Sequence, residues 1–212
     1  MEQACRVHEG DDRDRRLDKL GLTARVVTAA VEAGEAEARQ CTDNDPSMAR
    51  GMVRYFRTVR VLREGTAALG WGRDNPRNLA RAVSPEREHA IVPALGDERA
   101  GDPAVSPSTK YDKGTMIMEA IGANLQLALF DLPTAQPGDN AGGRPVTTWI
   151  LLYHVADDEI RYELSLPVES SGGFISRWQE RILFPPLPRE PQPEVAFDDE
   201  YGPEIDILVA RR

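Results

Sequence analysis

The chain has 212 residues, of which 41% are hydrophobic and 29% charged, the ordinary composition of a globular protein with one or two domains. Two cysteines are too few for a disulfide framework, and no apolar stretch approaches the roughly 18 residues of a membrane span. The net charge of −9 argues against attraction of the whole surface to nucleic acid or anionic lipid. We therefore expect a cytoplasmic protein that has no membrane partner.

A helical hairpin is expected over residues 17–70. From Leu17 to Gln40, apolar residues recur at three- and four-residue spacing, which predicts one helix. Gly34 in its middle is expected to weaken that helix by about 1 kcal/mol relative to alanine. Asp45, followed by proline, is a helix-start signal and predicts a second helix over residues 46–68.

The rest of the chain predicts a sheet and one more helix. Apolar residues at helical spacing predict a helix over 115–130. Strand 160–166 alternates, so its polar residues Glu163 and Ser165 are expected to point outward. Pro93 is expected either to place its own strand at an edge or to end that strand early. The expected strands are Leu79–Val83, His89–Leu95, Thr147–Val155, Ile160–Leu166, Phe174–Phe184 and Ile205–Ala210.

Helices and strands occur in blocks, which favours the α+β class: an N-terminal αα-hairpin packed on a mostly antiparallel sheet of about five to six strands, with one further helix. Residues 1–16 are charge-dense and aperiodic and are interpreted as a disordered polar tail. Residues 17–212 are expected to form one domain, because the hairpin alone would leave its apolar stripe without a partner. Within it, residues 71–184 carry the sheet, and 185–212 form a proline-rich crossing and a C-terminal edge strand.

Five segments of the sequence carry a resemblance to one protein family: GWGRDNPRN, SPEREHAIVPALGDERAGDP, PSTKYDKG, YELSLPVE and WQERILFP. Over roughly residues 25–185 the chain resembles a family of uncharacterised bacterial proteins. The resemblance implies a bacterial origin and carriage on mobile elements, but no activity and no site residues. The ratio of 23 arginines to three lysines also indicates a GC-rich bacterial genome.

Two sets of basic residues are binding candidates. Arg50, Arg54 and Arg57 lie at spacings of four and three residues, which places them on one side of the second predicted helix. That stripe suits a solvated face, an acidic protein partner or phosphates. Lys110 and Lys113 lie in the long loop 96–114, which is interpreted either as a functional loop or as a mobile one.

An acidic set is the candidate for metal chemistry. Asp97 and Asp102 in the same loop, together with Glu163, are the residue types that bind a divalent cation in hydrolases and nucleases. No lysine follows Lys113, so the usual lysine partner of such nuclease sites is absent after the predicted hairpin. His154 is interpreted as a sheet residue, and Cys41 has no neighbouring histidine that would activate it.

Three functions remain open on the sequence. The first is a non-catalytic accessory or protein-interaction module that needs no cofactor. It would contact a protein partner or a second copy through the Arg stripe, the loop 96–114 or the acidic residues 198–200. The second is a metal-dependent hydrolase or nuclease-like enzyme using the acidic set. The third is a nucleic-acid-binding regulator that uses the Arg stripe of helix 46–68, although the net charge makes nucleic acid the less favoured partner.

Overall fold

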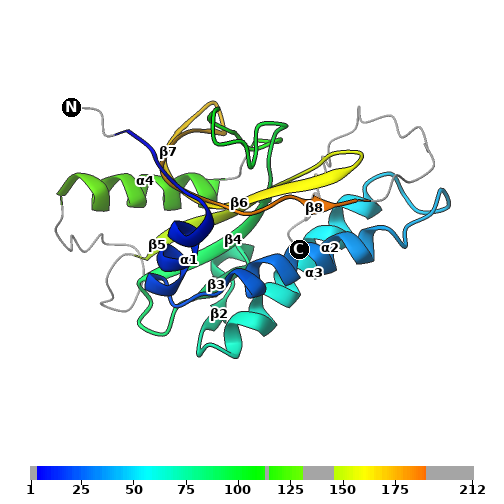
Figure 1. The fold of residues 1–212 in the computed structure, drawn as a ribbon, viewed down its shortest axis with the longest axis horizontal. Helices are drawn as coiled ribbons and strands as arrows, with labels where there is room; N and C mark the ends of the chain where they lie inside the picture. Colours follow the sequence, from blue (N-terminus) through cyan, green and yellow to red (C-terminus); the bar gives the residue numbers. More distant parts are fainter. Residues whose placement is uncertain (1–3, 113–114, 131–145, 190–212) are drawn as a thin grey trace, which may run out of the picture.

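The computed structural model describes residues 4–112, 115–130 and 146–189, and Figure 1 shows them as one sheet with helices on both faces. The helices are α1 (Gly10–Lys19), α2 (Ala24–Ala38), α3 (Ala49–Ala67) and α4 (Thr115–Phe130). The strands are β1 (Arg6–His8), β2 (Gly72–Asp74), β3 (Arg81–Val83), β4 (His89–Leu95), β5 (Thr147–Val155), β6 (Glu159–Ser171), β7 (Phe174–Leu183) and β8 (Leu187–Pro188).

The sheet is mixed and mostly antiparallel, and the α+β class is confirmed. Its strand order is β1-β7-β6-β5-β4-β3-β2, and β8 pairs with the start of β6. Two pairs are parallel: β4 with β5, which are connected through α4, and β1 with β7. The described sheet has eight strands instead of the expected five to six, because β1, β2 and β8 have only two or three residues each.

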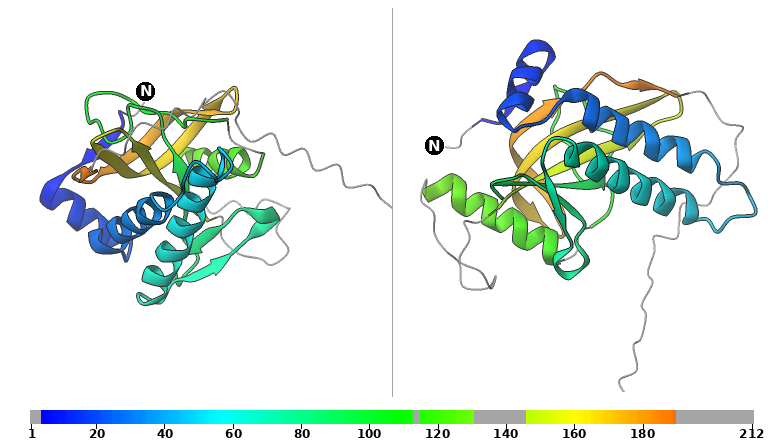
Figure 2. Two further views of the ribbon diagram at one scale, coloured as in Figure 1. Left: turned by 90° about the vertical axis from the view of Figure 1, so that its right-hand side faces the viewer. Right: turned by 90° about the horizontal axis from the view of Figure 1, so that it is seen from below.

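The hairpin of α2 and α3 covers one face of the sheet, and α4 covers the other (Figure 2). On the hairpin face, side chains such as Val27 of α2 and Leu62 of α3 pack against Leu151 and Leu164. On the opposite face, the buried amide of Asn124 anchors α4. It donates to the Thr148 carbonyl at 2.8 Å and accepts the Thr148 N–H at 2.8 Å. None of the described helices has the length and apolar composition that crossing a bilayer requires.

The expected tail over residues 1–16 is wrong for the residues that the structure describes. Residues 6–8 form β1, and α1 begins at Gly10. Arg6 lies opposite Glu180 in the sheet, and Leu17 at the end of α1 is only 1% exposed. Local composition does not indicate a strand at residues 6–8, because its partner, β7, lies far along the chain.

The helical hairpin is confirmed, but its boundaries are shorter than expected. Gly21 adopts a left-handed φ of 68° and separates α1 from α2, so residues 17–40 form no single helix. The second helix starts at Ala49 instead of residue 46. The reason is that the Asp45 carboxylate accepts the Thr42 N–H at 2.8 Å and therefore caps a loop turn.

Pro93 does not lie in an edge strand as expected, because β4 is flanked by β3 and β5. The pairing with β3 involves only Ala90 and Ile91 of β4, so Pro93 lies beyond it and no hydrogen bond to β3 is lost. The predicted bounds of β4, β5 and α4 are confirmed. The predicted strand Ile205–Ala210 lies outside the described residues, as does the segment 131–145 between α4 and β5.

Candidate functional site

The loop that follows β4 continues the sheet before it crosses the face that α4 also covers. The N–H of Asp97 donates to the Ser108 carbonyl at 2.9 Å, and the N–H of Lys110 donates to the Leu95 carbonyl at 3.0 Å. Residues 96–112 therefore leave the sheet and return to it at the same place. We refer to this segment as loop 96–112.

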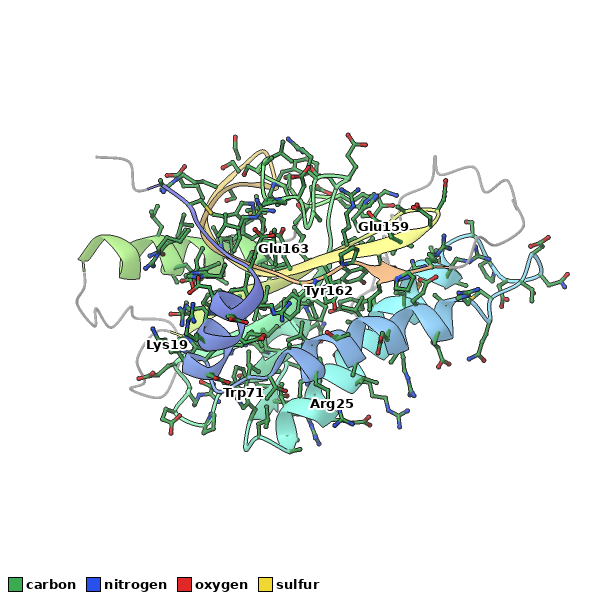
Figure 3. All side chains as sticks on the ribbon, in the orientation of Figure 1. Lys19, Arg25, Trp71, Glu159, Tyr162 and Glu163 are labelled. Carbon is green, nitrogen blue, oxygen red and sulfur yellow. The ribbon has the colours of Figure 1, made fainter. Side chains whose placement is uncertain are left out.

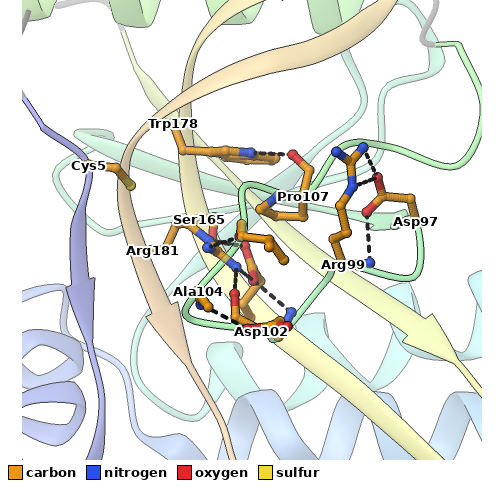
Figure 4. A network of polar contacts seen from close by, with 12 residues as sticks. Cys5, Asp97, Arg99, Asp102, Ala104, Pro107, Ser165, Trp178 and Arg181 are labelled. Atoms are coloured by element: carbon orange, nitrogen blue, oxygen red, sulfur yellow. Dashed lines mark hydrogen bonds and ion pairs between the residues drawn. The ribbon is translucent and has the colours of Figure 1, made fainter.

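A buried ion pair between β6 and β7 holds the middle of loop 96–112 (Figure 4). The Arg181 guanidinium contacts the Glu163 carboxylate at 2.5 and 3.0 Å, and their side chains are 3% and 0% exposed. Arg181 also donates to the Val105 carbonyl at 2.8 Å and to the Asp102 carbonyl at 3.0 Å. Glu163 accepts the Gly101 N–H at 2.8 Å, so both partners of the ion pair hold the loop.

Glu163 therefore lies in the interior, not on an outer face as expected. Ser165 is also fully buried and donates its hydroxyl to Glu163 at 2.7 Å. In Figure 3 the neighbouring residues Tyr162 and Glu163 lie in the middle of the molecule. Tyr162 points toward α2, with its hydroxyl 2.9 Å from Thr28, and Glu163 points toward the loop.

The distal end of the β6–β7 hairpin contacts the second half of loop 96–112, as Figure 1 shows above the sheet. The Trp178 indole donates to the Pro107 carbonyl at 2.8 Å, and the Ser108 hydroxyl donates to the Ile175 carbonyl at 2.8 Å. A Cβ at Gly173 would lie 2.8 Å from the Cβ of Asp112, so only glycine fits there. Register shifts between residues 166 and 170 mark bulges, which bend the hairpin toward the loop.

Two large apolar side chains are exposed where the end of the loop meets the start of β7. Tyr111 of the loop is 41% exposed and Phe174 of β7 is 40% exposed. Lys110 and Asp112 flank Tyr111, and the Lys110 ammonium lies 5.6 Å from the Tyr111 ring centre. We call these four residues the loop platform. It offers an apolar centre with one charge of each sign beside it.

The structure does not bring the acidic candidates together around a cation site. Asp97 contacts Arg99 at 2.5 Å, and Asp102 accepts the Ala104 N–H at 2.8 Å. Glu163 is occupied by Arg181, Ser165 and the loop backbone. Within residues 4–112, 115–130 and 146–189, no three His, Cys, Asp or Glu side chains are grouped as metal ligands.

The Arg stripe is not a continuous basic face. Arg54 is only 8% exposed and lies 2.8 Å from Glu35, a buried carboxylate of α2. Arg50 donates to the Cys41 carbonyl at 3.3 Å, and the Arg57 guanidinium lies 3.8 Å from Glu37. Lys113, the other loop candidate, lies outside the described residues.

Two titratable groups near the loop have shifted pKa values, the Cys5 thiol and the His154 imidazole. Burial raises the pKa of the Cys5 thiol, which disfavours the reactive thiolate. His154 lies in β5 opposite Arg161, as expected of a sheet residue. Burial, followed by the neighbouring charge of Arg161, lowers the pKa of His154. Both effects favour the neutral form of the imidazole.

Sequence reasoning missed Arg181 and the Gly101 contact. The neighbouring strand β5 held an indirect signal, because it is apolar on both faces, with Ile150 and Leu152 fully buried. That pattern is compatible with a covered polar face on β6 as well, but it does not identify Arg181 or Gly101 as contacts of Glu163.

A scan against protein-family models, a search of curated proteins and a search of solved structures each found no match to this chain. The resemblance to a family of uncharacterised bacterial proteins stays a prediction.

Proposed function

We propose that this protein is a non-catalytic interaction module that associates with a second copy of itself through the loop platform. The observation that carries this proposal is the buried Glu163–Arg181 pair, whose remaining hydrogen bonds fix the backbone of a surface loop. Functional loops are typically positioned by a rigid scaffold in this way.

The hydrogen bonds explain why the platform presents a defined surface. Arg181 and Glu163 together make three bonds to the loop backbone, at Gly101, Asp102 and Val105. A further contact from Trp178 holds the loop near Pro107. A surface fixed before binding loses less conformational entropy when it forms a contact, so it supports association better than a loose loop of the same composition.

The charges of the platform favour a second copy as the partner. In a two-fold dimer the same patch lies on both sides of the contact, so the patch must complement itself. Lys110 and Asp112 have opposite charges and lie on either side of Tyr111. A two-fold rotation near Tyr111 pairs Lys110 of each copy with Asp112 of the other, around an apolar centre.

Sedimentation velocity of the full chain tests the proposal. We expect a concentration-dependent species of twice the 23.5 kDa chain mass. Tyr111→Ser combined with Phe174→Ser should leave only the monomer. Leu69→Ser, which alters an equally exposed apolar residue outside the platform, should not change the dimer. A wild type that stays monomeric, or a double variant that stays dimeric, would refute the platform as the contact.

Charge exchange gives a sharper version of the test. Lys110→Asp and Asp112→Lys each place like charges opposite one another, so each variant alone should dimerise more weakly. Combining both changes in one chain should restore the dimer. Mixing the two single variants should produce a heterodimer, because one has two acidic and the other two basic residues beside Tyr111. If the double variant and the mixture dimerise as weakly as each single variant alone, the pairing of Lys110 with Asp112 is contradicted.

The two alternative functions receive no comparable support from the described residues. The hypothesis of a hydrolase or nuclease-like enzyme requires the carboxylates of Asp97, Asp102 and Glu163 to surround one cation, and each of them has another partner. The nucleic-acid reading needs Arg54 at the surface, and Arg54 is buried. Both remain predictions from the sequence.

A further inference from the structure

The outer face of α3 carries a second exposed apolar patch, which lies on a different element from the loop platform. Phe56 is 58% exposed and Met52, one helical turn earlier, is 37% exposed. The Tyr55 ring centre lies 5.9 Å from that of Phe56 and extends the aromatic surface. A phenylalanine this exposed beside a methionine on a helix is typical of a contact surface.

The charge of α3 is opposite to that of the whole chain. Its 19 residues include five arginines and one glutamate, whereas the chain as a whole has a net charge of −9. Arg57 and Arg60 follow Phe56 on the helix and are 36% and 66% exposed. Arg60 contacts Glu64 at 2.9 Å, an exposed pair that is easily exchanged for another acidic partner. The apolar patch is thus bordered by accessible cations, which fits an acidic segment with apolar side chains.

The C-terminal segment of this chain has that composition and starts beside the α2–α3 hairpin. Residues 190–212, outside the described part, contain seven acidic and two basic residues, together with Phe197 and Tyr201. The last described residue, Arg189, donates to Glu35 at 2.8 Å and to the Ala156 carbonyl at 3.0 Å. Glu35 also contacts Arg54 of α3 at 2.8 Å, so a single carboxylate links the exit point to α3.

The length of the segment suffices for it to reach the patch. Its 23 residues span up to about 75 Å when extended, against about 28 Å for the whole of α3. Because the segment is tethered beside the helix, its effective concentration there is far higher than that of a separate chain. Tethering therefore favours this segment over an equally acidic partner in solution.

We propose that residues 190–212 of the same chain lie on the exposed face of α3, with their aromatic side chains on Met52 and Phe56 and their acidic side chains facing Arg57 and Arg60. This inference is independent of the loop platform. It assigns a binding surface to α3 and an intramolecular ligand to it.

Photo-crosslinking in the full chain tests the placement. The photoreactive residue p-benzoylphenylalanine replaces Phe56, and the crosslinked peptides are mapped by mass spectrometry separately from the monomer and dimer bands of a dilute sample. We expect crosslinks to residues 190–212 whose yield does not change on dilution. Crosslinks only to a second copy, or to no other segment of the chain, would overturn the proposal. The same probe at Phe174 should give crosslinks between copies, so failure of one proposal is distinguishable from failure of the other.

Charge reversal tests the electrostatic part in the same assay. Combining Arg57→Glu with Arg60→Glu should lower the crosslink yield to residues 190–212 several-fold, and added salt should lower the wild-type yield, because salt screens exposed charges. Arg25→Glu is the matched control, since Arg25 is an exposed arginine on α2 at the other end of the hairpin (Figure 3). An undiminished yield in the double reversal, or an equal loss with Arg25→Glu, would overturn the proposal.

Discussion

Replacing Glu163 by glutamine is expected to destabilise the protein strongly and to release loop 96–112. Glu163 is fully buried and accepts hydrogen bonds from Arg181, Ser165 and the Gly101 N–H. The substitution leaves the Arg181 guanidinium buried without a counter-charge, which costs about 3–5 kcal/mol. A typical domain has a free energy of unfolding of about 5–15 kcal/mol, so the loss is a large fraction of the total.

Urea unfolding followed by tryptophan fluorescence measures this loss, and hydrogen exchange of the loop amides locates it. The indole of Trp178, one of three tryptophans, donates to the Pro107 carbonyl, so the Trp178 part of the emission changes when the loop is released. The matched control is a second Arg–Glu pair between β6 and β7, Arg177 with Glu169, whose side chains are 29% and 47% exposed. Arg177→Met should cost no more than about 1 kcal/mol.

A double-mutant cycle separates the ion pair from its surroundings. Glu163→Leu with Arg181→Met removes both charges, so the combined loss should be clearly smaller than the sum of the two single losses. It should not vanish, because the carbonyls of Asp102 and Val105 lose their donor. If Glu163→Gln costs less than about 1 kcal/mol, as for a surface pair, or if the single losses simply add, the reasoning about the buried pair is refuted.

Two further predictions concern the helical hairpin and pH. Gly34→Ala should lower the free energy of unfolding in urea by about 1–3 kcal/mol, because the new Cβ would lie 2.1 Å from the Thr58 hydroxyl. Gly51→Ala, whose Cβ would meet nothing within 4 Å, should be neutral or stabilising. Equal effects of the two substitutions would contradict the packing argument. Burial lowers the pKa values of His89 and His154 below the ordinary 6.5, so the unfolded state binds more protons just below that pH. The melting temperature should therefore fall as the pH drops below 6.5. Combining His89→Gln with His154→Gln should reduce the dependence of the melting temperature on pH. An unchanged dependence would contradict the assignment to these two histidines.

The parts of the fold that follow from local pattern were predictable from the sequence. The predicted bounds of α4, β4 and β5 agree with the structure, because helical apolar spacing marks α4 and continuous apolar runs mark β4 and β5. Gly34 shows the limit of such reasoning. Propensity predicts a weaker helix there, whereas the structure buries Gly34 where α3 approaches α2, with Thr58 directly opposite.

The candidate site was only partly predictable, because its key contacts join residues that are distant in sequence. Glu163 and Lys110 were recognised as candidates, and the loop 96–114, of which residues 96–112 are described, as the segment of interest. The roles of the two residues depend on Arg181 and on the bend in the β6–β7 hairpin, which no local pattern indicates. An alternating strand looks the same whether water or a loop covers its polar face. The polar side of β6 was therefore assigned to solvent when it is in fact interior.

The pairing of β1 with β7 has a consequence for the order in which the protein assembles during synthesis. Arg6 lies opposite Glu180, so β1, which precedes the other described strands in the chain, waits for the synthesis of β7 before it can join the sheet. Until then α1 has no β7 edge to contact, although the α2–α3 hairpin can already form from local contacts. Incorporation of the N-terminal segment is therefore a late step of folding, and a bulky fusion at the N-terminus should delay it more than it disturbs the hairpin.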